Sequence, residues 1–374
     1  MNVKPSSRLF TPLHIGTLQL RNRIVIAPMC QYSADDGSAT DWHLMHLGHL
    51  ALSGSGLLIT EATAVCAEGR ITPRDLGLYS DANQSALARV LQAIRKYSPM
   101  PVAVQLAHAG RKASNQVPWE GGAQIAPHAP NGWQTVAPSD VPQSPEQVPP
   151  LALDHAGLGR VRDQFVAAAR RAVELKFDAI ELHGAHGYLL HEFLSPIANR
   201  RGDDYGGSLQ NRMRFPLEVF DAVRAATPAG MPVWMRISAT DWMPDGWGID
   251  DAVVFSEALE RHGCAAVHVS SGGISLQQRL VPEPGYQVPF ARRVKALVSI
   301  PTIAVGLITE PAQAESIIAG GSADAIALAR GILYDPRWPW HAAASLGASV
   351  WAPPQYLRCQ PTGLKNLFEL KSPA

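Results

Sequence analysis

The sequence predicts an α/β protein built as a (β/α)8 TIM barrel, on the evidence of three observations. Short apolar runs recur along the chain, a helix-like stretch follows each run, and eight such pairs occur in succession. Most of the runs are apolar nearly throughout, as expected for parallel strands that are buried on both faces. The alternative is a doubly wound open sheet, but that fold rarely needs eight evenly spaced units, and no GxGxxG motif follows the first run. Eight ordered pairs therefore favour the barrel.

The eight predicted strands are short segments rich in Val, Ile, Leu and Ala. They lie at Ile24–Cys30, Leu57–Val65, Val102–Gly110, Ala179–Gly187, Val233–Ser238, Ala265–Gly273, Thr302–Gly306 and Ala325–Arg330.

Capping residues predict where four of the intervening helices begin. Asp154 begins one that ends near Leu175, Ser208 one that ends near Ala226, Asp250 one that stops at Gly263, and Thr309 one with Pro311 in its first turn. The other helical stretches are Asp41–Leu52, Asp81–Tyr97, Gln287–Val298 and Pro336–Leu346.

Three segments fall outside this repeat. Leu9–Arg23 has alternating apolar residues around a glycine, which predicts an N-terminal hairpin at the bottom of the barrel. Residues 116–150 are rich in Pro, Gly and Trp and form a long loop after strand 3, which makes them a candidate lid. The tail, residues 351–374, has little periodicity. We expect residues 1–374 to form a single domain, because barrels of this kind commonly exceed the average domain length.

Composition excludes several classes of protein. The formal net charge is zero, whereas a nucleic-acid-binding protein needs a basic face. No window approaches the roughly 18–20 apolar residues of a membrane span, and no apolar segment follows Met1–Pro5. The four cysteines show neither a CxxC motif nor zinc-site spacing. These features predict a cytoplasmic protein without disulfides that acts on small molecules.

In a (β/α)8 barrel the active site lies at the carboxyl ends of the strands, so the polar residues there are the candidates. At the first strand end Cys30 is either a site residue or a small buried hydrophobe. At the second, Glu61 is expected to be a buried, paired carboxylate, whereas Ala62 is small enough for a flat ring to lie against the backbone. At the third, Gln105 both donates and accepts hydrogen bonds, which suits a heterocycle. Arg111 and Lys112 follow as either site residues or solvated loop charges.

The fourth strand end carries the clearest signal, because His183, His186 and Tyr188 lie close together and are separated by small residues. Two neutral imidazoles can both donate an N–H to one substrate oxygen, and a nearby tyrosine can act as a general acid. A buried Arg236 at the fifth strand end needs an anionic partner, either a carboxylate or a cofactor that becomes anionic when reduced. After strands seven and eight, Gly306 and Arg330 are suited to bind a phosphate.

Two other functions remain open at this point. In a barrel metallohydrolase, His183 and His186 would bind a metal with Asp241 or Asp324, although no third ligand stands at a strand end. In a non-catalytic flavin-binding sensor, Cys30 would be the oxidisable thiol.

Several motifs together resemble the old yellow enzyme family. They are Ala27–Tyr32, Glu61–Thr63, Gln105–Lys112, His183–Leu190, Leu194–Arg201, Asp204–Ser208 and Asn211–Arg212, and their order covers nearly the whole chain. Cys30 at the first strand end resembles the thermophilic-like, xenobiotic-reductase branch, since other branches carry Thr there.

The resemblance implies a noncovalent FMN, NADPH or NADH as the reductant, and an ene-reductase reaction on activated C=C bonds of α,β-unsaturated carbonyl compounds, with nitro compounds and quinones as further acceptors. Pro28, Met29 and Ala62 would line the flavin, Gln105 and Arg236 would contact its pyrimidine edge, and Gly306, Ala329 and Arg330 would hold its phosphate. Cys30 would tune its potential. Tyr32, Lys112, His183, His186 and Tyr188 would line the substrate pocket, with Tyr188 as the proton donor and no metal.

Three features of the last third of the chain also bear on this resemblance. Leu307 stands where some relatives carry Trp, which alters the pocket. The segment Gln355–Arg358 resembles an arginine finger that enters a neighbouring subunit's site, which implies a homodimer or homotetramer. An iron–sulfur reductase with the same barrel would need clustered cysteines after the barrel, where only Cys359 occurs.

Overall fold

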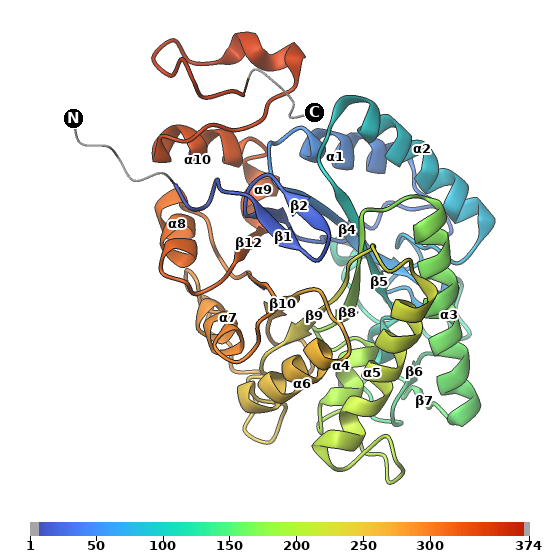
Figure 1. Ribbon diagram of the computed structural model, residues 1–374. Coiled ribbons are helices and arrows are strands. Elements are labelled where there is room, and N and C mark those ends of the chain that lie inside the picture. The colour runs from blue at the N-terminus through green and yellow to red at the C-terminus, as the bar shows by residue number, and fades with distance from the viewer. Residues whose placement is uncertain (1–6, 370–374) are drawn as a thin grey trace.

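The computed structural model describes residues 7–369, in which eight parallel strands close into a barrel surrounded by helices (Figure 1). Going round the barrel, the last strand pairs with the first, so the barrel sheet has no open edge. The strands are β3 (Ile24–Ile26), β4 (Leu57–Ala64), β5 (Val102–Ala107), β8 (Ala179–Gly184), β9 (Val233–Ser238), β10 (Val267–Ser270), β11 (Thr302–Ala304) and β12 (Ala325–Leu328). Each lies within a predicted strand, which confirms the predicted fold.

The helices lie on the outside of the barrel (Figure 1). They are α1 (Asp41–Ala51), α2 (Asp81–Tyr97), α3 (His155–Glu174), α4 (Leu189–Leu194), α5 (Leu209–Ala226), α6 (Ile249–Arg261), α7 (Val288–Lys295), α8 (Pro311–Ala319), α9 (Arg330–Tyr334) and α10 (Trp338–Leu346). The sequence patterns did not predict the short helices α4 and α9.

Two of the four predicted helix caps are confirmed. The Asp154 carboxylate accepts a hydrogen bond from Gly157 N at 2.7 Å, and the Ser208 hydroxyl accepts one from Asn211 N at 3.2 Å. The other two predictions are wrong by one or two residues. Helix α6 is capped by Gly248, so Asp250 lies in its first turn, where a carboxylate is favourable beside the helix dipole. Helix α8 is capped by Glu310, because Pro311 is the first helical residue and requires an extended residue directly before it.

An N-terminal hairpin closes the bottom of the barrel, as predicted. Strands β1 (Leu13–Ile15) and β2 (Leu18–Leu20) pair in antiparallel fashion, and Ile15 and Leu20 are fully buried. The turn residue Gly16 has a φ of +57°, and a Cβ added there would lie 3.4 Å from the side chain of Pro232, just before β9. The hairpin therefore packs against the amino ends of the barrel strands (Figure 1).

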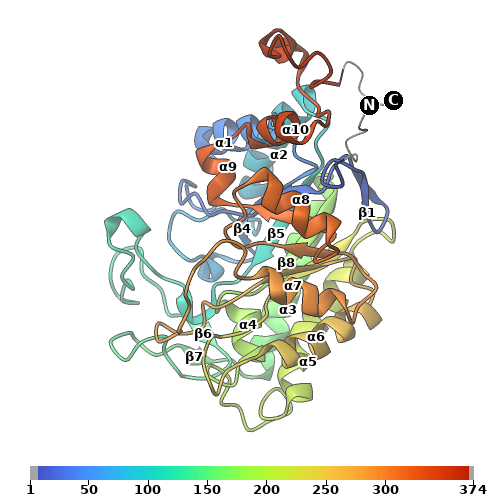
Figure 2. The same ribbon diagram turned by 90° about the vertical axis from the view of Figure 1, so that its left-hand side faces the viewer.

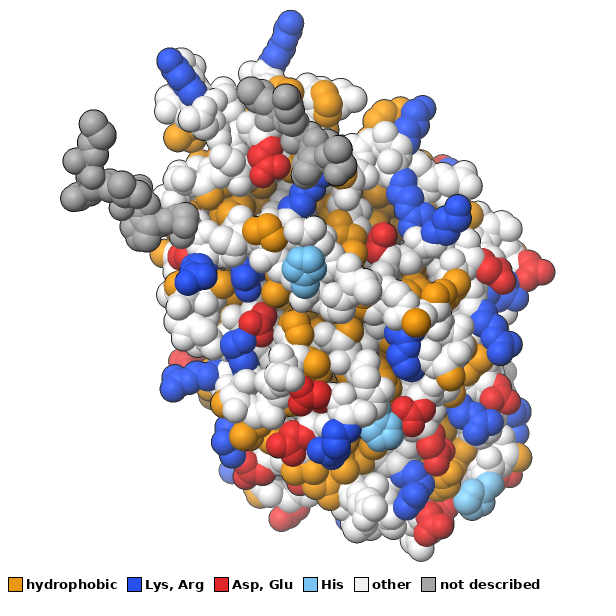
Figure 3. Space-filling model, viewed as in Figure 1, with side chains coloured by type: hydrophobic (Ala, Val, Ile, Leu, Met, Phe, Trp, Pro, Cys, Tyr) orange, Lys and Arg blue, Asp and Glu red, His pale blue; other side chains and the backbone are white. Residues whose placement is uncertain are grey.

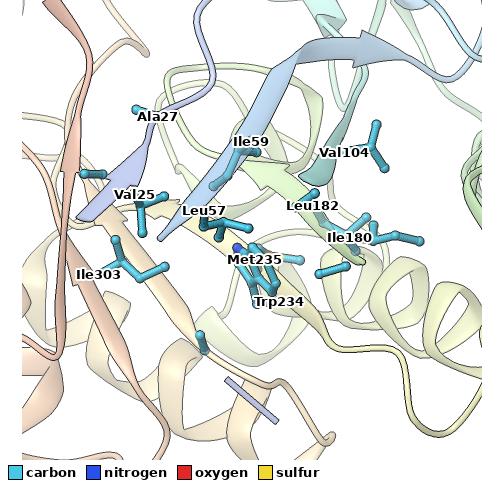
Figure 4. Close-up of a cluster of buried hydrophobic side chains, with 14 of the residues drawn as sticks. Val25, Ala27, Leu57, Ile59, Val104, Ile180, Leu182, Trp234, Met235 and Ile303 are labelled. Atoms are coloured by element: carbon cyan, nitrogen blue, oxygen red, sulfur yellow. The ribbon is translucent and has the colours of Figure 1, made fainter. Parts of the chain in front are cut away.

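Apolar side chains from successive strands fill the barrel and the layer between strands and helices. Figure 4 shows Val25, Leu57, Ile59, Ile180 and Trp234 within one such cluster, and all five are buried. Burying a side chain of this size contributes roughly 1.5–3 kcal/mol to folding. This packed core holds the strand ends in place, and the functional side chains project from those ends.

The long loop predicted after strand 3 is present on the opposite side of the barrel from the hairpin. The short 3₁₀ helix η2 (Gly110–Lys112) precedes it, and the loop contains η3 (Pro118–Glu120). Its strand β6 (Val136–Ala137) pairs with β7 (Leu151–Ala152), directly after the loop. In Figure 2 the loop region projects at the left, and the hairpin lies at the right. The loop thus stands at the carboxyl ends of the strands.

The tail forms an arm beyond α10 (Figure 1). It contains the 3₁₀ helix η4 (Pro354–Cys359), and a bridge between Val350 and Phe368 closes it against Trp340 and Ala343, apart from the main core. Of the predicted tail, residues 370–374 lie outside the described part.

Basic and acidic side chains are interspersed over the face shown in Figure 3, in keeping with the zero net charge. Within residues 7–369 no helix has both the length and the apolar character that a membrane crossing requires.

Candidate active site

The His183, His186 and Tyr188 side chains come together where β8 ends. The His183 ring centroid lies 5.1 Å from that of His186 and 4.9 Å from that of Tyr188, and both pairs are nearly perpendicular. The turn that brings them together is tight, since His186 and Gly187 have φ values of +59° and +74°. A Cβ at Gly187 would lie 2.2 Å from Gly273 O, so only glycine fits at this position.

Hydrogen bonding and burial set the protonation of His183. Its Nδ1 accepts the Ala185 N–H at 3.2 Å, which places the ring proton on Nε2 and makes Nε2–H the available donor. Burial lowers the pKa values of His183 and His186 well below their usual value, and the Arg236 charge lowers both further. Both imidazoles are therefore neutral near pH 7 and can act as hydrogen-bond donors without carrying charge.

Two residues without an assigned role in the sequence analysis hold His186. Its backbone N–H donates to Ser238 Oγ at 2.9 Å, and its Nε2 lies 2.7 Å from Ser270 Oγ. Ser270 in turn lies 3.3 Å from Gln287 Oε1. The position of Ser270 at the end of the sixth predicted strand was the available signal, whereas Gln287 lay inside a predicted helix.

Tyr188 and Lys112 lie next to each other in the site. Burial raises the pKa of Tyr188 well above its usual value, so the phenol keeps its proton. The Lys112 Nζ lies 4.9 Å from the centroid of the Tyr188 ring, and burial lowers the pKa of Lys112 to about 8. Arg111 is also buried, and its guanidinium donates to Ile274 O at 2.7 Å. The alternative of solvated loop charges is therefore wrong for both residues.

Cys30 and Tyr32 follow β3 on another side of the mouth. Burial raises the pKa of Cys30 well above its usual value, so the side chain is a thiol rather than a thiolate. Burial also raises the pKa of Tyr32. The Tyr32 ring packs edge-on against that of Trp119, with the two ring centroids 6.0 Å apart. Tyr32, Trp119 and Trp133 line an outer cavity of about 870 Å³. The long loop thus contributes two tryptophans to the wall beside Tyr32.

Glu61 is a paired structural carboxylate, as expected. It lies 3.2 Å from His43 Nε2 and accepts the Gln31 N–H at 2.9 Å, which ties the segment after β3 to β4. The neighbouring Ala62 is buried and pairs in register with Gln105 on β5. The Glu61 carboxylate is therefore occupied by these partners, and Ala62 is the residue of this pair that remains for the barrel mouth.

A buried carboxylate that the sequence analysis did not single out, Glu181, organises the next part of the site. It accepts hydrogen bonds from Gln105 Nε2, Trp234 Nε1 and His268 Nδ1 at 2.7, 2.7 and 2.8 Å. Burial alone would raise the pKa of Glu181, but the charge and hydrogen bond of His268, with the nearby Arg236, lower it. The available signal was an acidic residue inside an otherwise apolar strand.

Arg236 is buried at the end of β9 and is only partly neutralised. Burial lowers its pKa, and the negative charge of Glu181 raises it in turn. Among the described residues, its Nε is buried without a hydrogen-bond partner. An orphaned buried donor costs roughly 1–3 kcal/mol. This atom therefore fits a ligand with an acceptor or a negative charge at this place.

A cavity of about 380 Å³ extends from Arg236 toward the ends of β11 and β12. His186, Gly306, Ala329 and Arg330 all line it, with Tyr286 and Gln287. Gly306 has a φ of +123°, and a Cβ there would lie 2.7 Å from Gln287 Nε2. Arg330 is exposed at the start of α9, free to contact an anion. The orphaned donor, the cavity and the exposed arginine fit an elongated cofactor with a phosphate at one end.

Of the remaining predicted site residues, those after β3 lie at the barrel mouth, whereas Arg358 does not. Pro28, Met29 and Cys30 are half-buried directly after β3, and the backbone N–H of the preceding Ala27 donates to Leu328 O of β12 at 2.9 Å. Arg358 is exposed on η4 in the arm, which Figure 2 places above the barrel rather than at its mouth. The structure therefore does not bring Arg358 to the site of its own chain, and its role in a neighbouring subunit stays a prediction.

Known proteins share this sequence and arrangement. Residues 8–348 match the NADH:flavin oxidoreductase / NADH oxidase family. An NADPH dehydrogenase of Geobacillus sp. (strain WCH70) is 42% identical over 352 residues, covering 94% of this chain and 98% of the relative. One from Listeria innocua serovar 6a is 40% identical over 354 residues, covering 94% and 99%. The solved structure of morphinone reductase aligns with a TM-score of 0.76 at 27% identity, covering 93% of this chain and 92% of that one.

These matches confirm the resemblance to the old yellow enzymes and replace the metallohydrolase and sensor alternatives. The cavity that runs from Arg236 to Arg330 and the family match across most of the chain lead to the same assignment. The chain belongs to the NADH:flavin oxidoreductase / NADH oxidase family and is an NAD(P)H oxidoreductase that uses FMN.

Proposed function

We propose that the chain reduces the activated C=C bond of α,β-unsaturated carbonyl compounds by a ping-pong mechanism, with nitro compounds and quinones as further acceptors. The observation that carries this proposal is the convergence of His183, His186 and Tyr188. Two neutral imidazoles suit a carbonyl oxygen, and a phenol that keeps its proton suits the carbon beside that carbonyl. These three side chains therefore suit a substrate that accepts a hydride on one carbon and a proton on the next.

The cofactor residues divide between the two ends of the mouth. FMN, when bound, takes hydride from the nicotinamide and passes it to the acceptor. Gly306, Ala329 and Arg330 would hold its phosphate, beside the open cavity that they line. Arg236 would offer its orphaned Nε–H, and Gln105 its carbonyl oxygen, to the polar edge of the ring. Pro28, Met29, Cys30 and Ala62 would form the surface on which the ring lies.

The acceptor is activated and protonated by groups from the end of β8. His183 donates its Nε2–H to the carbonyl oxygen. His186, whose Nε2 is bonded to Ser270 Oγ, donates its Nδ1–H to the same oxygen, so negative charge drawn onto that oxygen is stabilised. The β-carbon receives hydride, and Tyr188 gives its phenolic proton to the α-carbon and is reprotonated from solvent. The loss of one such charge-stabilising donor commonly costs about 10²–10³ in rate.

Steady-state and rapid-reaction kinetics with NADPH and 2-cyclohexenone test this proposal. The purified protein should be yellow, release FMN on denaturation, and give parallel lines in double-reciprocal plots. In anaerobic stopped-flow experiments, NADPH should bleach the flavin, and 2-cyclohexenone should restore its absorbance within the turnover time. Bleaching by NADPH without any reoxidation by enones, nitro compounds or quinones would overturn the proposed acceptor class and leave the oxidoreductase assignment intact.

We also propose that the arm carries Arg358 into the site of a neighbouring subunit in a homodimer or homotetramer. The exposure of Arg358 and its distance from the mouth of its own chain support this. Mixing an inactive Tyr188→Phe protein with an Arg358→Ala protein tests it. Because the two defects lie in different subunits' contributions to one site, hybrid oligomers should regain part of the activity, whereas hybrids no better than the average of the two parents would contradict the proposal.

A further inference from the structure

We propose that Lys112 is a positioning residue for the proton-transfer step. It holds the His186 turn against the loop after β10 and places a positive charge behind the ring of Tyr188. This inference rests on the proposed function, and it gives Lys112 a role other than the direct substrate contact suggested by its motif.

The first observation is the hydrogen bonding of the ammonium group. Lys112 Nζ donates to His186 O at 2.8 Å and to Gly273 O at 3.0 Å, so two of its three protons are committed to backbone. These oxygens belong to two different loops, after β8 and after β10. The ammonium group therefore fastens the loop that carries the carbonyl-binding imidazole to its neighbour, and little of it is left to hold a substrate.

The two loops meet so closely that they need such a fastening. His186 and Gly273 both have positive φ values, +59° and +96°. A Cβ added to Gly273 would lie 2.4 Å from His186 O, so the backbones are in direct contact. Two carbonyl oxygens that converge on one point repel each other unless a cation lies between them. Lys112 supplies that cation, and without it the strained turn at His186 loses one of its supports.

The second observation is the position of the charge relative to the proton donor. Lys112 Nζ lies 4.9 Å from the Tyr188 ring centroid, within the range of a cation–π contact. The phenol becomes more negative as it releases its proton, so a nearby cation stabilises the transition state more than the ground state. Burial disfavours the phenolate, so a cation over the ring opposes the effect of burial on this step.

The third observation is that the charge of Lys112 is not cancelled by Glu192, the acid that acts on it. Glu192 contributes to the electrostatic surroundings of Lys112, but burial raises the pKa of Glu192 to about 8. Near pH 7 the Glu192 carboxyl is therefore mostly neutral. The hydrogen-bond partners of Lys112 are carbonyl oxygens, which leave its full positive charge facing Tyr188.

The test compares Lys112→Met with the wild-type holoenzyme in the two half-reactions. Flavin reduction by NADPH should stay within about twofold, whereas reoxidation by 2-cyclohexenone should slow by about 10–100-fold, in line with the loss of one electrostatic contact in the site. Lys96→Met is the matched control, because Lys96 lies 5.2 Å from the ring centroid of Tyr97, away from the site. It should change neither rate. If Lys112→Met yields too little folded protein, Lys112→Gln removes the charge and keeps an N–H donor.

A second measurement separates positioning from a general structural effect. Lys112→Met should slow reoxidation less in a Tyr188→Phe background than in wild type, because the charge has no proton donor left to act on and only the support of the His186 turn is lost. Amide hydrogen exchange, which needs no turnover, should accelerate over residues 185–188 and 272–275 in Lys112→Met and stay unchanged elsewhere.

Three results would overturn the inference. They are equal slowing of both half-reactions, an undiminished loss in the Tyr188→Phe background, and unchanged exchange at both loops. A wild-type enzyme that does not reduce 2-cyclohexenone at all would instead contradict the proposed function, and the exchange measurement would still report on the loops.

Discussion

Gln105 donates its side-chain amide to the Glu181 carboxylate over 2.7 Å, across the register pair that joins β5 to β8. A carboxylate only accepts hydrogen bonds, so this contact determines which way the amide points. The NH₂ group of Gln105 faces Glu181, and its carbonyl oxygen remains for the mouth. One buried acid thus decides that Gln105 offers an acceptor, rather than a donor, to the proposed flavin site.

Replacing Glu181 should lower both the stability of the fold and the affinity for FMN. Glu181→Gln places an NH₂ group among three side-chain N–H groups that now donate to the carboxylate. Donors would then face donors, so the substitution should lower the free energy of unfolding by about 2–4 kcal/mol. It should also weaken FMN binding, because Gln105 is no longer oriented. Urea denaturation of the apoprotein and fluorescence titration with FMN measure the two effects. Glu174→Gln, at an exposed carboxylate bonded to Gln84, is the control and should change neither.

Tyr188→Phe should separate the two half-reactions. In the proposed mechanism the phenol gives up its proton only when the acceptor is reduced, so reoxidation by 2-cyclohexenone should slow by about 10²–10⁴-fold, the usual contribution of a general acid. Flavin reduction by NADPH should change less than about threefold. Stopped-flow absorbance of the flavin records both rates. Equal losses in the two would show that Tyr188 does not donate the proton.

The barrel could be predicted from the sequence because its signal is repeated and local. The eight apolar runs report burial on both faces, and each strand was found within its predicted limits. The ends of the elements were less predictable. Asp250 and Thr309 look like good caps by residue type, but the neighbouring Gly248 and Pro311 decide where the extended backbone stops. Short helices such as α4 have too few turns to show a period.

The site could be predicted where its residues lie close together in the chain. His183, His186 and Tyr188 are near neighbours in sequence, so their cluster was visible as a motif. Glu181 and Gln287 were missed because their roles depend on contacts across strands and loops. The same holds for the burial of Arg111 and the backbone contacts of Lys112, since a charged pair in a loop reads as solvated until the packing around it is known.

Gly306→Ala should damage the proposed phosphate end of the site. The new Cβ would lie 2.7 Å from Gln287 Nε2 at a φ of +123°, so both the backbone and the cavity wall must move. We expect FMN affinity to fall by about 10–100-fold, measured by fluorescence titration of the apoprotein. Gly321→Ala is the matched control, because its φ is also positive, at +70°, but nothing lies within 4 Å of its added Cβ. It should destabilise the fold modestly and leave FMN affinity unchanged.

Glu192 should make the protein less stable as the pH rises from about 4.5 to about 8. Burial, opposed by Arg111, raises the pKa of Glu192 to about 8. The folded chain therefore keeps this proton over a range in which the unfolded chain releases it, and stability falls by at most about 1.4 kcal/mol per pH unit.

Glu192→Gln imitates the protonated acid, so its stability should match wild type at pH 4.5 and exceed it at pH 9. Urea unfolding across this range tests the prediction, with the exposed Glu310→Gln as control. A variant curve parallel to wild type would show that Glu192 ionises normally in the folded chain.

The hairpin at the bottom of the barrel also restricts how ligands reach the strand ends. With Ile15 and Leu20 sealed under the barrel, molecules reach the opposite end only from its own side. In the proposed ping-pong mechanism, the spent nicotinamide would then leave, and the acceptor would enter, through the same opening. An excess of either one blocks the exit of the other, so this shape predicts that turnover falls again when the acceptor is supplied at very high concentration.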